Sequence, residues 1–160
     1  MTLRKPNIIS KIGSLIPGFN GYSDRDDRRS AEKIFRDQNS KILEISENNI
    51  IDHQKKLIAK NKIESSKIWE TARKEINTLI AKFKHAPYGA SSFFSKEQIK
   101  EDELIKIFEF DENVVEKIQL ILNITETQLN EKMSVQYIFE NVKEIENILL
   151  DRHSFIRHFK

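Results

Sequence analysis

The sequence predicts an all-α protein, in which a long helical hairpin and two further helices form an elongated four-helix bundle. No glycine or proline occurs between Gly21 and Pro87, and these two residue types are the usual interruptions of helices. Hydrophobic residues recur at steps of three and four in three later stretches of the chain. Charged residues make up 32% of the chain and hydrophobic ones 38%, which suits helices with wide solvated faces.

The first 22 residues are predicted to be an arm, and residues 23–160 the bundle domain. Pro6 suits the first turn of a short helix, and Pro17-Gly18 ends it. Its apolar residues follow a helical spacing: Ile8, Ile12, Leu15 and Ile16. These four side chains are candidate membrane contacts, because the segment is basic and amphipathic. We favour an arm that caps the bundle, because a short helix anchored by Ile binds lipid weakly.

The helical hairpin is expected between residues 23 and 86. One unbroken helix of that length would extend about 95 Å and could not bury a shared core. The reversal is expected at Lys60-Asn61-Lys62, since Asn tolerates the left-handed conformation that ends many helices. Ser23 or Asp24 can cap the first helix of the hairpin. The apolar pattern of this helix drifts around its axis, as expected of a helix with more than one neighbour. The second helix of the hairpin has a regular apolar stripe: Trp69, Ala72, Ile76, Leu79 and Phe83.

Short motifs spread along the chain resemble an uncharacterised family of bacterial all-helical proteins. The first is the turn Pro17-Gly18-Phe19-Asn20-Gly21-Tyr22, followed by the acidic and arginine-rich segment 24–29. The others are residues 85–94, Phe108-Glu109-Phe110-Asp111, residues 149–152 and Arg157. The resemblance covers the chain from its first turn to its last helix. It implies a helical fold and no particular reaction.

A loop over residues 85–95 concentrates aromatic side chains. Pro87 and Gly89 favour a turn, and Tyr88, Phe93 and Phe94 are candidate partner-binding residues because aromatics anchor many interfaces. The alternative, which we favour, is a hydrophobic plug over the end of the hairpin.

A third helix is expected from Asp102 to Asn123, and a buried charge is expected within it. Asp111 falls in the apolar stripe, where a carboxylate is costly unless it is paired. Arg28, Arg29 or Arg152 can supply the partner. A structural ion pair is expected rather than a catalytic acid, because no second acid or base lies at a useful spacing.

The last helix is expected from Ser134 to His158, after a polar linker or short helical turn. Its stripe has the strongest periodicity: Val135, Ile138, Val142, Ile145, Leu149, His153 and Ile156. Such a seam is typical of bundles and coiled coils, and it can pack within the chain or pair two chains. His153 is expected to be a hydrogen-bonded histidine at the core or its edge rather than a metal ligand.

Charge is unevenly distributed along the chain despite a net charge of +2. Nine Lys and Arg residues lie between positions 55 and 84 against three Glu residues, and the balance reverses between positions 97 and 116. We expect the acidic segment to lie beside the basic hairpin. Nucleic-acid binding is less expected, because it usually comes with a larger net charge and interleaved aromatics.

No enzyme class is supported by the sequence, and no metal, cofactor or small-molecule substrate is inferred. The chain has no cysteine and four glycines, and no phosphate loop, nucleophile elbow or zinc-protease motif is present. No Glu-x-x-His occurs, which argues against a di-iron bundle. We expect a cytoplasmic, non-enzymatic interaction or scaffold protein that binds another protein or itself. The alternatives are association with a membrane surface through the arm, and binding of nucleic acid or ribosomes through the basic hairpin.

Overall fold

Residues 12–86 and 91–160 are described by the computed structural model. Four long helices account for most of them: α2 (Arg28–Ala59), α3 (Ile63–Lys84), α4 (Glu101–Thr127) and α5 (Ser134–Arg157). A short 3₁₀ helix, η1 (Ser92–Phe94), lies between α3 and α4. No strand occurs within the described ranges, so the predicted all-α class is confirmed.

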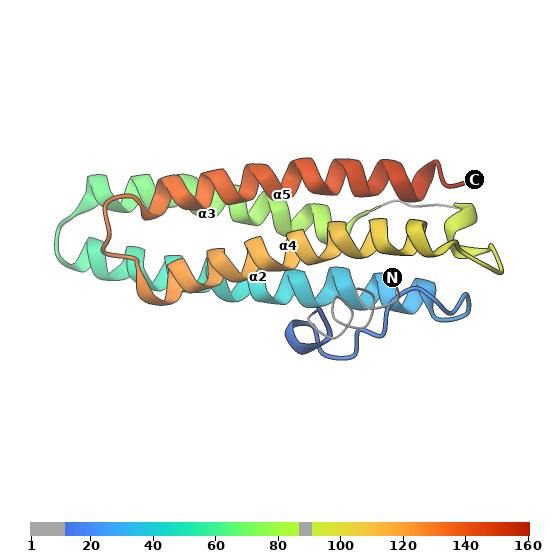
Figure 1. Ribbon diagram of the computed structural model, residues 1–160. Coiled ribbons are helices and arrows are strands. Elements are labelled where there is room, and N and C mark those ends of the chain that lie inside the picture. The colour runs from blue at the N-terminus through green and yellow to red at the C-terminus, as the bar shows by residue number, and fades with distance from the viewer. Residues whose placement is uncertain (1–11, 87–90) are drawn as a thin grey trace.

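The four helices form an elongated bundle made of two antiparallel hairpins (Figure 1). The α2–α3 and α4–α5 hairpins pack with α2 beside α4 and α3 beside α5. Both interhelical turns lie at one end, which we call the hairpin end (residues 53–68 and 120–137). The first turn of α2, η1 and the carboxyl terminus lie at the other, which we call the η1 end (residues 22–28, 91–104 and 152–160).

The turn between α2 and α3 lies where the sequence predicts it. Lys60 is the C-cap of α2, and Asn61 has a φ of 58°, in the left-handed region. The start of α2 differs from the expected cap at Ser23 or Asp24. The Asp24 carboxylate accepts a hydrogen bond from the Asp26 N–H at 3.0 Å, which closes a separate turn, so the helix begins only at Arg28.

The drifting pattern of α2 is explained by its two neighbours and by polar side chains that it buries. Asn39 and Ser46 donate to the carbonyl oxygens of Phe35 and Ile42, one turn earlier, at 2.7 and 3.1 Å. Because these donors are satisfied within the helix, Asn39 and Ser46 can be buried in the bundle.

The helix α4 continues past its expected end at Asn123. Ile124 is buried, and Thr125 is buried and accepts a hydrogen bond from the Asn49 side chain of α2 at 3.2 Å. Part of the predicted linker is therefore the last turn of α4. At its other end, the first turn of α4 is acidic, where the helix dipole favours anions.

The acidic segment lies beside one helix of the basic hairpin, α2, and not beside α3. The helix α4 packs against α2 and α5, and cations of α3 pair with acids of those two helices instead. Arg73 contacts Glu47 at 2.9 Å, and Lys82 contacts Glu146 at 2.9 Å.

The stripe of α5 packs within the chain. Ile138, Val142, Ile145 and Ile156 are buried, and Val135 and Leu149 are partly buried against the same core. The seam is thus covered by the other helices of the same chain, which is the first of the two expected arrangements.

Aromatic side chains close the η1 end of the bundle. The ring of Tyr22 lies 5.6 Å from Phe93, and Phe93 lies 5.5 Å from Phe159. The hydroxyls of Ser91 and Ser92 donate to the carbonyl oxygens of Ile156 and Phe159. The segment that includes η1 is therefore fastened to the end of α5 as a plug.

Candidate functional site

Four buried polar side chains meet inside the η1 half of the bundle, and we call them the ion cluster: Tyr22, Glu32, Asp111 and Arg152. The Arg152 guanidinium donates to Asp111 Oδ1 at 2.6 Å and to the Glu32 carboxylate at 2.5 and 3.0 Å. It also donates to the Tyr22 hydroxyl at 2.8 Å. One arginine of α5 thus joins α2, α4 and the segment before α2.

The electrostatics of the ion cluster follow from burial and from an excess of acids. Burial raises the pKa of Asp111 to about 6, with the Glu32 charge adding to the rise and Arg152 opposing it. Burial and the neighbouring Asp111 also raise the pKa of Tyr22 well above its ordinary value. Two carboxylates share one fully buried guanidinium, so the cluster resists full ionisation.

A second buried arginine, Arg28, contacts no carboxylate among the described residues. Arg28 donates to the carbonyl oxygens of Tyr22 at 2.8 Å and Phe93 at 3.1 Å, and to that of Lys96. Its burial lowers its pKa. Because the three carbonyls belong to two distant stretches of chain, Arg28 holds the arm and the η1 segment against the start of α2.

The ion cluster is closed to solvent. Arg152 and Asp111 are 0% exposed, and Glu32 is 2% exposed, so no substrate can reach them in this conformation. Removing one member of such a set leaves an uncompensated buried charge, whereas the intact set fixes the alignment of the helices.

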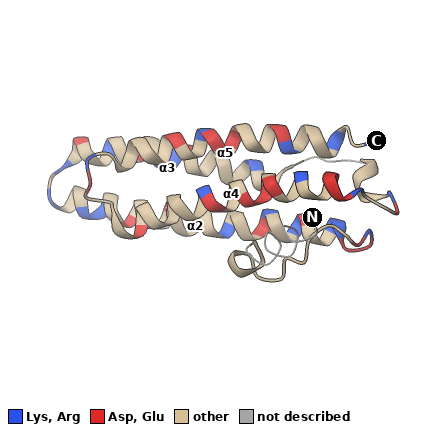
Figure 2. Ribbon diagram, in the orientation of Figure 1, with Lys and Arg blue, Asp and Glu red and all other residues tan. Residues whose placement is uncertain are grey.

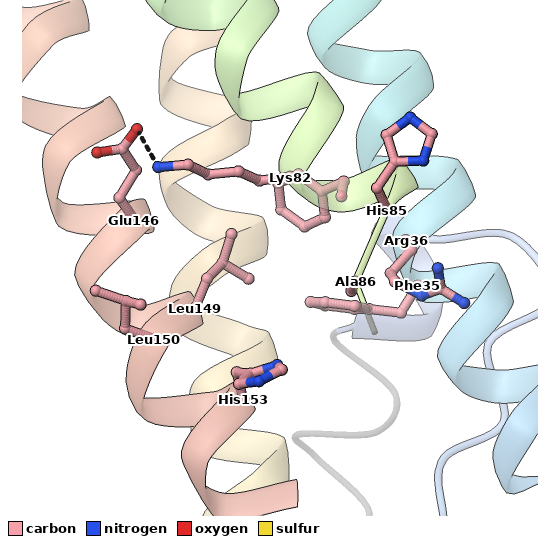
Figure 3. A pocket seen from close by; sticks show the side chains of 10 residues that line it. Phe35, Arg36, Lys82, His85, Ala86, Glu146, Leu149, Leu150 and His153 are labelled. Carbon is pink, nitrogen blue, oxygen red and sulfur yellow. Dashed lines mark ion pairs between the residues drawn. The ribbon is translucent and has the colours of Figure 1, made fainter. Parts of the chain in front are cut away.

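A pocket of about 320 Å³ lies beside the cluster, between α2, α5 and the end of α3 (Figure 3). It is largely apolar, and its floor includes Phe35, over whose ring the Arg152 guanidinium lies at 4.2 Å. Arg36, Lys82, His85 and His153 also line it. Phe35 thus belongs to both the pocket and the surroundings of the ion cluster.

The hairpin end combines exposed apolar side chains with lysines. Within the described residues, six of the eight exposed large hydrophobics lie there: Ile58, Ile63, Ile68, Leu120, Met133 and Tyr137. Lysines colour the α2–α3 turn blue in Figure 2. A hollow of about 250 Å³ at this end is lined by Lys56, Lys60 and Lys62, none of which forms an ion pair with a described residue. Burial and the lysines lower the pKa of the adjoining His53.

The structure brings together some of the residues predicted to share a buried charge. Asp111 and Arg152 are in contact, and Arg28 is buried but bonds to carbonyl oxygens instead. Arg29 is exposed, with its guanidinium 4.5 Å from the centre of the Phe94 ring, so its assignment as a buried charge is wrong.

The candidate partner-binding and membrane-contact residues are mostly covered. Phe93 and Phe94 are buried in the plug, so they do not form an exposed docking surface. Ile12 and Ile16 are buried and Leu15 packs against the same core, so they do not face a membrane. Tyr88 and Ile8 lie outside the described residues.

Sequence reasoning missed Glu32 and Tyr22 as members of the ion cluster. Glu32 lies four residues after Arg28 and three before Phe35, on the inward face of α2. That spacing was an available signal for a second buried carboxylate. Tyr22 gave none, because its position is set by a turn and not by a helical repeat.

Neither metal ligation nor membrane spanning has support in the described ranges. No group of three or more His, Cys, Asp or Glu side chains there is arranged to hold a metal ion. None of the helices described is both long enough and apolar enough to cross a bilayer. No protein-family model, curated protein or solved structure matches this chain. The resemblance to a bacterial helical family therefore stays a prediction.

Proposed function

We propose that this chain is a non-enzymatic interaction protein, a rigid helical bundle that presents its hairpin end to another protein in the cytoplasm. The supporting observation is the gathering of exposed large hydrophobics at that end, among them Ile58, Met133 and Tyr137. Exposed apolar side chains that are rimmed by charges are typical of protein-binding surfaces.

The chemistry of the hairpin end suggests the kind of partner. Lys56, Lys60 and Lys62 line the hollow beside the apolar side chains, and Glu126 is the acidic residue among its lining. A partner surface that offers carboxylates around apolar side chains would be complementary in charge and in hydrophobicity. Nucleic-acid bases stack on exposed aromatic side chains, and surfaces that bind RNA or DNA usually carry several of them. Among the described residues of the hairpin end, Tyr137 is the one exposed aromatic, which favours a protein partner over RNA or DNA.

The test is affinity purification with matched variants of the full chain. A double variant, Ile58→Glu and Met133→Glu, places charges on the hairpin end at two exposed positions, so the fold should be retained. Ile45→Glu is the control, because Ile45 is equally exposed but lies in the middle of α2. The proposal expects a partner that copurifies with the wild type and the control and is lost with the double variant.

The same samples separate the alternatives. Loss of the copurifying species after nuclease treatment would replace the proposal with nucleic-acid binding, whose salt dependence is steep. Equal recovery with the double variant and the wild type would rule out the hairpin end. Cell fractionation tests the cytoplasmic location.

A further inference from the structure

The helix α3 is too short to cover its two neighbours along their full length. It has 22 residues against 32 in α2, and it starts directly after a tight turn, so it falls short by about 15 Å at 1.5 Å per residue. Lys82 near its end pairs with Glu146 of α5 at 2.9 Å, and Lys84 pairs with Glu44 of α2. Beyond this level, α2 and α5 continue without α3 between them.

The pocket of about 320 Å³ occupies the space that α3 leaves open. Phe35 of α2 and Leu149 of α5 lie on opposite sides of it, and Leu150 lines its outer edge on α5 (Figure 3). Leu150 is 67% exposed, the largest exposed fraction among the large hydrophobics of the described residues. The walls therefore offer an apolar slot that opens to solvent.

The charges around the slot favour an anion. Arg36, Lys82, His85 and His153 line it, against one acid, Glu146, which is paired with Lys82. Arg36 Nε lies 3.5 Å from Glu32 Oε1 but has no hydrogen-bond partner. Glu32 therefore shares its carboxylate between the hydrogen bonds from Arg152 and a longer ion pair with the Arg36 Nε.

We infer that this pocket binds a small carboxylic acid with an apolar stem. The carboxylate lies on the Arg36 guanidinium, whose planar fork matches a carboxylate in two parallel hydrogen bonds. The stem lies between Phe35, Leu149 and Leu150. At about 30 Å³ per small group, the volume holds roughly ten non-hydrogen atoms, which is the size of octanoate. The inference uses residues far from the hairpin end and is independent of the function proposed above.

The first test compares three ligands of equal stem length on the full chain. Octanoate, 1-octanol and octylamine are titrated separately, and amide chemical shifts are followed by two-dimensional NMR. Octanoate should bind with a Kd on the order of 1 mM and move resonances of residues 35–36 and 149–153. Octanol should bind about tenfold more weakly, because it lacks the charge-assisted hydrogen bonds to Arg36, and octylamine should bind more weakly still.

The second test uses variants on the two halves of the pocket. Arg36→Gln should weaken octanoate binding about tenfold and leave octanol binding unchanged, because it removes only the charge. Leu150→Asp should weaken both ligands, while Ile45→Asp, on another exposed position of α2, should change neither. Because Leu150 is largely exposed, Leu150→Asp should retain the fold, and it keeps the inference testable if Arg36→Gln fails to fold. Thermal unfolding checks the fold of each variant.

Three results would overturn the inference. They are no shift with octanoate up to about ten times the expected Kd, equal affinity for octylamine and octanoate, and shifts that Leu150→Asp does not alter.

Discussion

Arg152 is the residue on which the alignment of three chain segments depends. Its guanidinium holds Asp111 of α4, Glu32 of α2 and the Tyr22 hydroxyl, and it also stacks on Phe35. The planar fork of arginine supplies several donors in one plane, which a lysine in the same place could not.

Replacing Arg152 by methionine should destabilise the protein strongly. Arg152→Met keeps much of the side-chain volume but leaves the buried Asp111 carboxylate without its cation and Glu32 with only the longer ion pair to Arg36, and we expect a loss of about 3–5 kcal/mol. Urea unfolding followed by circular dichroism measures it. Arg25→Ala is the control, because Arg25 is largely exposed, and it should change the free energy of unfolding by less than about 0.5 kcal/mol. A loss for Arg152→Met as small as that of the control would contradict the structural role of the cluster.

Asp111 should make stability depend on pH in an unusual direction. Its pKa in the folded state is about 6, above the ordinary value of 3.8. As pH falls between these values, the folded state binds a proton before the unfolded state does. The contribution of Asp111 is therefore fully present below about 4 and is lost as pH rises through about 6.

The test compares the wild type with Asp111→Asn between pH 7 and pH 4.5. The wild type should gain stability relative to the variant by an amount on the order of 1–3 kcal/mol as pH falls, because Asn cannot take up the proton. Glu70, whose hydrogen bonds with Arg73 and Gln54 lower its pKa to about 2, is present in both proteins, so it changes the stability of each below pH 4.5 and cancels from their difference. Its contribution is lost as pH falls from about 4.5 toward 2. Parallel curves for the two proteins above pH 4.5 would refute the assignment.

The turn between α2 and α3 is the connection most dependent on one residue. Asn61 has a φ of 58°, a conformation that glycine adopts freely and alanine does not. Asn61→Ala should therefore cost about 1 kcal/mol, while Asn61→Gly should be neutral or slightly stabilising. Thermal unfolding of the pair measures the difference. An alanine variant as stable as the glycine variant would show that this conformation is not required.

The helices were predictable from the sequence because their signals are local. The turn at Asn61 follows from a lapse in the apolar pattern, and α5 was expected over 134–158 and is found at Ser134–Arg157. The start of α2 was missed because the Asp24 carboxylate closes a turn instead of capping the helix. The extension of α4 was missed because Ile124 and Thr125 are buried by another helix.

Only part of the candidate site was predictable, because it is built by contacts between distant residues. Asp111 stood out as a carboxylate in an apolar stripe, which indicated a buried partner. Periodicity could not indicate the choice of Arg152 over Arg29 or the hydroxyl of Tyr22, whereas the helical spacing of Glu32 from Arg28 and Phe35 was an available signal. The pocket depends on the difference in length between α2 and α3, a property of the assembled bundle.

The two ends of the whole molecule differ in what they bury. Toward the η1 end, charged groups such as Arg28 and Arg152 are inside and aromatic side chains form a plug around them. At the hairpin end, apolar side chains such as Ile58 and Met133 are outside beside lysines. Buried charges with specific partners fix the alignment of the helices at the η1 end. The hairpin end is the one that exposes apolar side chains to solvent, so it is the candidate binding surface.

The whole chain is expected to be an elongated monomer, because the stripe of α5 that could have paired two chains is covered within the bundle. Sedimentation or light scattering at tens of micromolar should give the chain mass of 18.9 kDa. A bundle about 50 Å long should have a radius of gyration on the order of 17 Å, above the roughly 15 Å of a compact domain of this length, and small-angle scattering measures it. A dimer that persists in Met133→Glu would contradict the covered seam. A dimer that this substitution dissociates would instead make a second copy of the chain the partner of the hairpin end.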